Sequence, residues 1–201
     1  MFISGAAGDM VPKEDELGDE AMTGMGVRLG KAAIGYMTEA CRNPARFGMP
    51  DAKVGSISRT FTVQLRKKYR NNPKRLPAPY LGKDDATLEI QCIAVGDVCF
   101  VGVPGELCAE LGQEIKWHSP FRRTFIAYNS TAYFSYMGPA NFLVSGGYEG
   151  PSQRFTARGS LELVRTAVDA MFELRESLYP SEGEPYPDEC PLPLVNILPN
   201  R

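Results

Sequence analysis

Alternating apolar and polar residues, or continuous apolar runs, predict strands in four parts of the chain. Residues 53–66 carry β-branched and aromatic residues in rough alternation, which is typical of one or two strands. Residues 87–95 alternate more strictly, and a turn at Gly96 followed by the apolar run at 98–103 predicts a hairpin. The apolar run at 98–103 predicts a strand that is buried on both faces, and residues 123–128 predict another buried strand.

Apolar residues recur at helical spacing in three further segments. The first follows the acidic residues 14–20, and its recurrence from Leu29 to Ala40 predicts a core-facing helix, whose glycines allow close packing. In the second, Glu106 opens an amphipathic helix that runs to Trp117. The third predicts a closing helix, with its apolar residues at Leu161, Val164, Val168, Met171, Phe172 and Leu178.

These elements predict an α/β fold in which a mixed β-sheet is layered with amphipathic helices. From Pro180 onward prolines are frequent, which predicts an extended tail or linker. We therefore divide the chain into a folded part, residues 1–179, and a Pro-rich tail, residues 180–201.

Charge and composition limit the classes of partner. The chain has 201 residues, is 43% hydrophobic and carries a net charge of −2, which is typical of a globular protein and disfavours nucleic-acid binding. The basic residues between Arg66 and Arg75 are best explained as a solvated loop, although a nucleic-acid or anionic-lipid patch there is a third, lowest-ranked hypothesis. No apolar run approaches the roughly 20 residues of a transmembrane helix, and no signal segment opens the chain.

The cysteines predict free thiols. Their number is odd and no C-x-x-C pair occurs. In the predicted hairpin, Cys92 lies opposite Val101, so Cys92 and Cys99 are diagonal neighbours about 7 Å apart, too far for an unstrained disulfide. The full set is Cys41, Cys92, Cys99, Cys108 and Cys190.

A carboxylate at a strand-to-helix corner is the first candidate for chemistry. Pro104-Gly105 ends the predicted strand sharply before Glu106. From the residues alone, we favour a charge that complements the positive end of the helix, worth under about 1 kcal/mol, over a ligand. The single histidine, His118, falls at the predicted helix end, where a surface or capping role is favoured. The chain contains no G-x-S-x-G, H-E-x-x-H or P-loop motif.

Two irregular stretches are further candidates. Gly5 and Gly8 permit positive φ or close approach to a ligand, although an ordinary strand-to-helix loop is the favoured interpretation. Residues 129–150 have no helical period and are crowded with aromatic side chains and glycines. Long irregular loops of this kind are often functional, although any single tyrosine packs by default over the core.

Three segments together resemble the neutral/alkaline, non-lysosomal ceramidases and the bacterial proteins that share their catalytic domain. The segments are Gly5-Ala6-Ala7-Gly8-Asp9-Met10-Val11-Pro12, the run 89–119 with Pro104-Gly105-Glu106, and the run 129–150 ending in Tyr148-Glu149-Gly150. Their order and spacing are similar to those of the family over about 180 residues of this chain.

The resemblance implies that the chain is the C-terminal part of a larger, zinc-dependent amidase domain. In that family two histidines from the first half and a glutamate and a tyrosine from the second half hold the metal, which activates water and polarises the amide carbonyl. The motif matches place the glutamate at Glu106 and the tyrosine ligand at Tyr136. Tyr148, twelve positions later, matches the tyrosine that stabilises the developing oxyanion.

Departures from the family pattern leave a second hypothesis open. Val11 stands where ceramidases carry a serine, and His118 matches neither histidine ligand, so those ligands are expected upstream and this chain alone is expected to be inactive. The first hypothesis is a hydrolase acting on a small-molecule or lipid amide, extracytoplasmic or secreted by family resemblance. The second is a non-catalytic remnant or binding module that keeps the fold.

Overall fold

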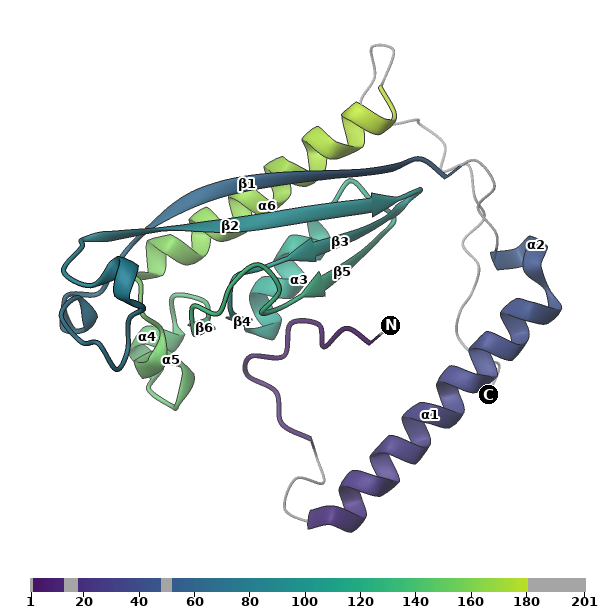
Figure 1. Cartoon of the computed structure of the whole chain (residues 1–201), viewed down its shortest axis with the longest axis horizontal. Helices are drawn as coiled ribbons and strands as arrows, with labels where there is room; N and C mark the ends of the chain where they lie inside the picture. The colour runs from purple at the N-terminus through teal and green to yellow at the C-terminus, as the bar shows by residue number, and fades with distance from the viewer. Residues whose placement is uncertain (1, 13–17, 48–51, 181–201) are drawn as a thin grey trace.

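The computed structural model describes residues 2–12, 18–47 and 52–180 (Figure 1). Nearly all of the predicted tail, including Cys190, lies outside the described residues. Within them, no helix is long and apolar enough to cross a bilayer.

A four-stranded mixed sheet forms the centre of the molecule. Its strands are β1 (Val54–Gln64), β2 (Asp85–Val95), β3 (Val98–Gly102) and β5 (Arg123–Ala127), in the order β1-β2-β3-β5. The first two pairings are antiparallel and β3 pairs with β5 in parallel. The hairpin turns at Gly96, whose φ is 58°, and its register places Cys92 opposite Val101 as predicted. The described cysteines, Cys41, Cys92, Cys99 and Cys108, are free thiols, also as predicted.

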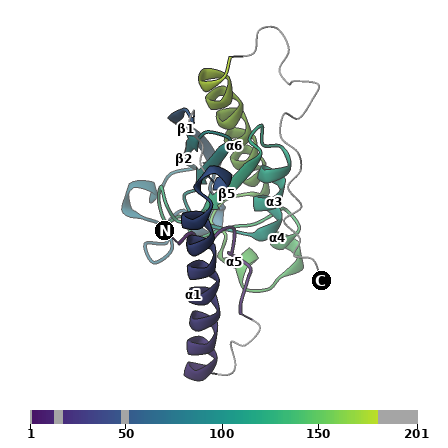
Figure 2. The same cartoon turned by 90° about the vertical axis from the view of Figure 1, so that its right-hand side faces the viewer.

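Two helices cover one face of this sheet (Figure 2). The long helix α6 (Ala157–Leu178) packs along β1 and β2, and α3 (Ala109–Trp117) packs against β5 and α6. The inward residues of β2 alternate as predicted and meet the buried side of α6. The α/β class with a mixed sheet and amphipathic helices is therefore confirmed.

The closing helix buries most of its predicted apolar side: Val164 and Met171 are buried, and Val168 and Leu178 pack against the core. Leu161 is 62% exposed and Phe172 is 41% exposed, although both were predicted apolar-face positions. The buried side also contains small residues, which let α6 lie close to the sheet. The Cβ of an alanine at Gly159 would lie 3.0 Å from the Val63 side chain. The buried residues are Gly159, Ser160, Leu163, Val164, Ala167, Ala170, Met171 and Leu174.

No described element covers the opposite face of the sheet. Phe100 is only half-buried and stacks on the exposed Phe125, with ring centroids 5.5 Å apart. Ile93, in register with Phe100, is also exposed. The prediction of burial on both faces therefore holds at the end of the first run, where Val101 and Val103 are buried, and fails at Phe100. The predicted buried strand at 123–128 buries Ile126 but leaves Phe125 on the open face.

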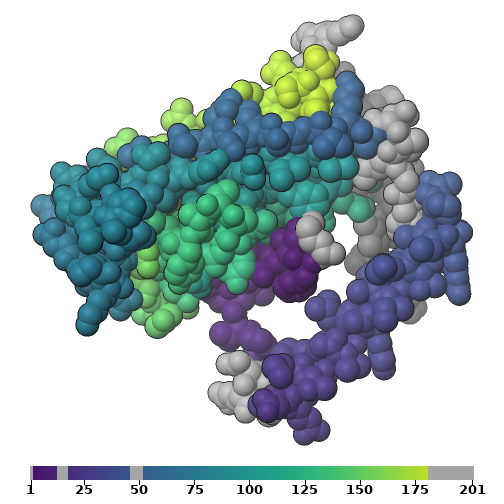
Figure 3. All heavy atoms as spheres, viewed as in Figure 1, coloured from purple at the N-terminus to yellow at the C-terminus, as the bar shows by residue number. Residues whose placement is uncertain are grey.

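The N-terminal helix α1 (Gly18–Arg42) forms as predicted but buries no residue, so the prediction that it faces the core is wrong (Figure 3). Leu29 is 56% exposed and Met37 is 68% exposed. The glycines of α1 make no close approach to another element: Gly26 and Gly30 have open space where a Cβ would lie. A short helix, α2 (Pro44–Phe47), follows α1.

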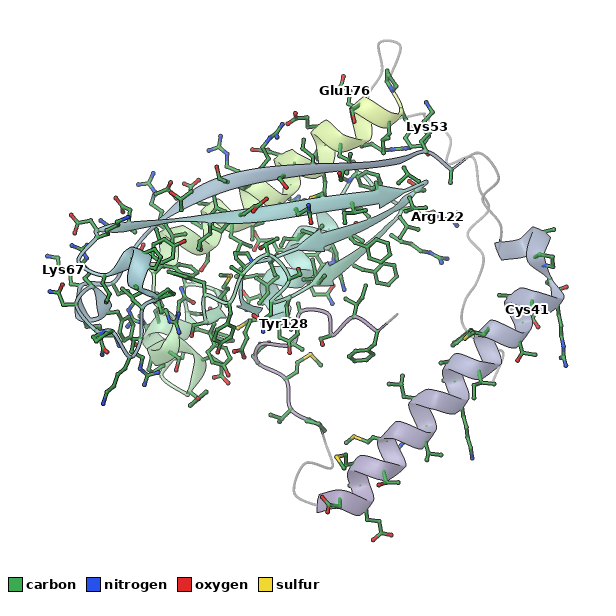
Figure 4. The ribbon with its side chains drawn as sticks, in the orientation of Figure 1. Cys41, Lys53, Lys67, Arg122, Tyr128 and Glu176 are labelled. Carbon is green, nitrogen blue, oxygen red and sulfur yellow. The ribbon has the colours of Figure 1, made fainter. Side chains whose placement is uncertain are left out.

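Two arginines of the basic loop after β1 make hydrogen bonds or ion pairs within the fold. It contains the short 3₁₀ helices η2 (Lys67–Tyr69) and η3 (Ala78–Tyr80). The Arg66 guanidinium donates to the carbonyl oxygens of Gly150 and Gln153 at 2.8 and 2.9 Å, and Arg70 pairs with Asp84. Lys67 of this loop lies at the end of the sheet opposite Lys53 and Arg122 (Figure 4).

Candidate functional site

The corner after β3 is shaped by glycine. A Cβ at Gly105 would lie 2.4 Å from the carbonyl oxygen of Ser135, so only glycine allows the two backbones to approach this closely. This approach lets the two-residue strand β4 (Glu106–Leu107) pair in parallel with β6 (Tyr136–Met137). The backbone of Glu106 is thus fixed against the aromatic loop.

Glu106 does not open a helix, contrary to the prediction. Its backbone N–H donates to the carbonyl oxygen of Ser135 at 3.0 Å, and the N–H of Cys108 donates to the carbonyl oxygen of Met137 at 3.0 Å. These hydrogen bonds belong to the strand pairing. Helix α3 begins only at Ala109. The favoured interpretation of Glu106 as a helix-end charge therefore loses its basis, because Leu107 and Cys108 separate it from the helix start.

The structure brings the three predicted site residues together. Glu106 and Tyr136 are directly opposite in the parallel register, which places their side chains on the same side of the β4–β6 pair. The ring of Tyr148 meets that of Tyr136 edge to face, with centroids 5.7 Å apart. Tyr148 lies in the segment between α4 (Phe142–Ser145) and α5 (Glu149–Ser152) and is 70% exposed.

Tyr133 is a member of this cluster that the sequence interpretation did not single out. Its hydroxyl donates to Glu106 Oε1 at 2.8 Å. The sequence showed Tyr133 only as one of several tyrosines in the loop. A two-residue strand gives no periodicity from which its contact with Glu106 could be predicted.

The N-terminal segment packs against the same corner. The N–H of Gly8 donates to the carbonyl oxygen of Leu107 at 2.8 Å, and a Cβ at Gly8 would lie 2.5 Å from the carbonyl oxygen of Glu106. Asp9 Oδ1 accepts a hydrogen bond of 2.7 Å from the N–H of Ala109, the first residue of α3. The close approach expected for Gly8 is thus made to the backbone of the candidate site. Val11, beyond it, is 80% exposed.

A buried polar network supports β6 from behind. The Gln153 side chain is fully buried, and its Oε1 accepts a hydrogen bond of 2.8 Å from the N–H of Gly138. The Ser160 hydroxyl donates to the carbonyl oxygen of Gly138 at 2.6 Å. Both polar groups of Gly138 are therefore satisfied by side chains, which holds the chain just after Tyr136 in place.

Burial and nearby carboxylates together shift the ionisation of the groups around Glu106. Burial, together with hydrogen bonding to Glu106 and its negative charge, raises the pKa of Tyr136 to about 12. Hydrogen bonding to Glu106 also raises the pKa of Tyr133. Burial, followed by the charges of Asp9 and Glu149, raises the pKa of Cys108 to about 12. At neutral pH the two tyrosines and the thiol are therefore protonated around an anionic centre.

The donor set fits part of a zinc site. A carboxylate and a phenol oxygen are acceptable zinc donors, but a zinc site ordinarily takes three or four protein ligands. Among residues 2–12, 18–47 and 52–180, no three His, Cys, Asp or Glu side chains are grouped so that they could hold a metal. His118 is exposed and caps the C-terminal end of α3, as predicted.

Comparisons with known proteins find matches among solved structures. No protein-family model matches the chain, and no curated protein matches it. A neutral ceramidase from Pseudomonas aeruginosa aligns with 63% of this chain and 29% of its own, at 17% identity and a TM-score of 0.49. A ceramidase complexed with C2 aligns with 46% of this chain and 15% of its own, at 24% identity and a TM-score of 0.42.

The aligned part is thus less than a third of either matched chain. Both proteins are ceramidases, the family that the sequence motifs resemble.

Proposed function

We propose that this chain supplies the glutamate and tyrosine ligands of a zinc-dependent, ceramidase-like hydrolase that acts on an amide bond. The observation that carries the proposal is the parallel register of Glu106 and Tyr136, which holds a carboxylate and a phenol side by side. The ligands that complete the shell come from outside this chain.

Zinc, when bound, supplies a Lewis acid that polarises an amide carbonyl and activates water. Glu106 and Tyr136 are the residues that would hold it. Tyr133 donates to one oxygen of the Glu106 carboxylate, which helps to fix the orientation of this proposed ligand. As a zinc ligand, Tyr136 would be required in its deprotonated form.

Tyr148 stabilises negative charge on the substrate oxygen. A tyrosine hydroxyl can donate a hydrogen bond, and the exposure of Tyr148 leaves it accessible to an incoming amide. Edge-to-face contact with Tyr136 keeps the donor beside the proposed metal ligand. A donor held in this way favours the transition state over the ground state.

Hydrolysis by the chain extended with its natural upstream sequence tests this function. We expect zinc-dependent release of the acyl group from an N-acyl amide, and a fall in kcat of about 10²–10³ in Tyr148→Phe. Tyr36→Phe, which alters an exposed tyrosine on α1, is the matched control and retains wild-type kcat. Equal activity in the Tyr148 and Tyr36 variants would refute the role of Tyr148.

Val11 favours a second candidate, a binding module without amidase activity. The position matched to the family serine carries an exposed side chain with no hydroxyl. In this alternative the extended protein binds zinc through Glu106 but releases no acyl group. Zinc binding measured beside turnover separates the two candidates.

A further inference from the structure

Arg154 contacts Tyr133, the residue that is hydrogen-bonded to Glu106. It lies just after α5, and its guanidinium carbon is 5.9 Å from the ring centroid of Tyr133 and 5.7 Å from that of Phe134. The hydroxyl of the same Tyr133 is hydrogen-bonded to Glu106. Tyr133 therefore connects the positive group to the carboxylate of the candidate site.

This cation has no anionic partner among the described residues. Its Nε is buried and makes no hydrogen bond within the part of the chain that the structure describes, and its guanidinium lies over two aromatic rings. Other arginines of the molecule differ, since Arg70 pairs with Asp84 and Arg59 pairs with Glu173. A partly buried guanidinium without an acceptor is costly, and an anion in contact with it removes that cost.

Partial burial acts on the same guanidinium. Burial is the main cause that lowers the pKa of Arg154, while Tyr133 acts in the opposite direction and the positive charge of Arg75 in the same one. The guanidinium fork matches the two oxygens of a carboxylate or phosphate, which a rounded ammonium does not.

We propose that Arg154 binds an oxyanion, a carboxylate or a phosphate, on a ligand whose amide group lies at Glu106. The amide part of this statement rests on the proposed hydrolase function, whereas the oxyanion site stands on the contacts of Arg154 alone. The substrate class that fits both is an N-acyl compound with an acidic group near the amide. An uncharged amide leaves Arg154 without a partner.

An NMR titration of the 201-residue chain without zinc tests the oxyanion site. The probes are N-acetylglycine, N-acetyl-O-phosphoethanolamine and the uncharged N-acetylethanolamine, followed at the Nε–H of Arg154 and the backbone amides of Tyr133 and Phe134. We expect the charged amides to bind at least about fivefold more tightly than the uncharged one. A stronger response to the carboxylate or to the phosphate identifies which oxyanion the site prefers.

Variants separate the role of Arg154 from general charge. Arg154→Gln abolishes the preference for the charged amides, and Arg154→Lys retains only part of it because the fork is lost. Arg165→Gln removes an exposed arginine of α6 and keeps the preference in full. Unchanged amide signals from α6 show that each variant is folded.

Two results would overturn the proposal. One is equal affinity of the wild-type chain for charged and uncharged amides, and the other is a preference that survives in Arg154→Gln. Because zinc is absent from this titration, failure of zinc binding at Glu106 leaves the outcome unaffected. The oxyanion site and the hydrolase function can thus fail separately.

Discussion

Tyr136 reports the coupling between the residues of the candidate site. We predict that it ionises with a pKa of about 12 and that Glu106→Gln lowers this value only partly, because burial is the largest cause of the shift. NMR titration of ring-labelled tyrosine measures the value, and Tyr136→Phe assigns the signal. A pKa of Tyr136 that does not change in Glu106→Gln would contradict the contact.

The same shift makes stability depend on pH in a defined direction. Between the ordinary tyrosine pKa of about 10 and the folded value of about 12, the unfolded chain has lost the Tyr136 proton while the folded chain keeps it. This contribution to stability is therefore complete below pH 10 and is lost as the pH rises toward 12. Chemical denaturation across this range should show a smaller decline in Tyr136→Phe than in wild type.

Prediction from sequence succeeded for individual residues only where a motif supplied the contact. Glu106 and Tyr136 are separated by thirty positions, and no local pattern indicates that they lie opposite each other. The family resemblance predicted that Glu106, Tyr136 and Tyr148 belong to one site. The structure places these three residues close together. Tyr133 and Arg154 were missed because their contacts depend on the path of an irregular loop.

At the level of elements, the β4–β6 pairing depends on Gly105. Gly105→Ala places a Cβ against the Ser135 carbonyl, so we predict a loss of about 1–3 kcal/mol in the free energy of unfolding, measured by urea denaturation. Gly26→Ala is the matched control: it lies inside α1 with open space around it, and alanine there is neutral or stabilising by up to about 1 kcal/mol. A Gly105 variant as stable as the Gly26 variant would contradict the close approach.

Periodicity identified the long elements and failed at the short ones. The β1 and β2 strands and the α6 helix were predicted because each has enough residues to show a period, and β3 was predicted from its apolar run. Glu106 was assigned to a helix because the apolar spacing of Leu107, Leu111 and Ile115 fits one. In the structure Leu107 is a buried residue of strand β4, whereas Leu111 and Ile115 are buried residues of helix α3. The helical spacing therefore arises from residues of two different elements.

For the whole molecule, the covered and open faces of the sheet should differ in their sensitivity to substitution. Leu163→Ala, on the buried side of α6, should lower the free energy of unfolding by about 2–5 kcal/mol. Ile93→Thr, on the open face, should change it by less than about 0.5 kcal/mol, since Ile93 is 42% exposed. Urea denaturation of both variants measures the difference, and similar losses would contradict the one-sided packing.

The layering of the molecule could be predicted only in part. Amphipathic patterns show that a segment has an apolar side, but they do not show what that side meets. Both α1 and the outer side of β3 were expected to be buried for this reason. In the structure Met37 of α1 and Phe125, beside β3, remain exposed.

Zinc titration of the chain tests the central claim most directly. We predict weak binding, with a Kd on the order of 10–100 μM because only part of the shell is present, and perturbation of the Tyr136 signal on addition of zinc. Glu106→Gln should weaken this binding at least about tenfold, whereas Glu110→Gln, an exposed neighbour on α3, should leave it unchanged. Zinc binding of equal strength in Glu106→Gln and wild type, with no response at Tyr136, would contradict the account.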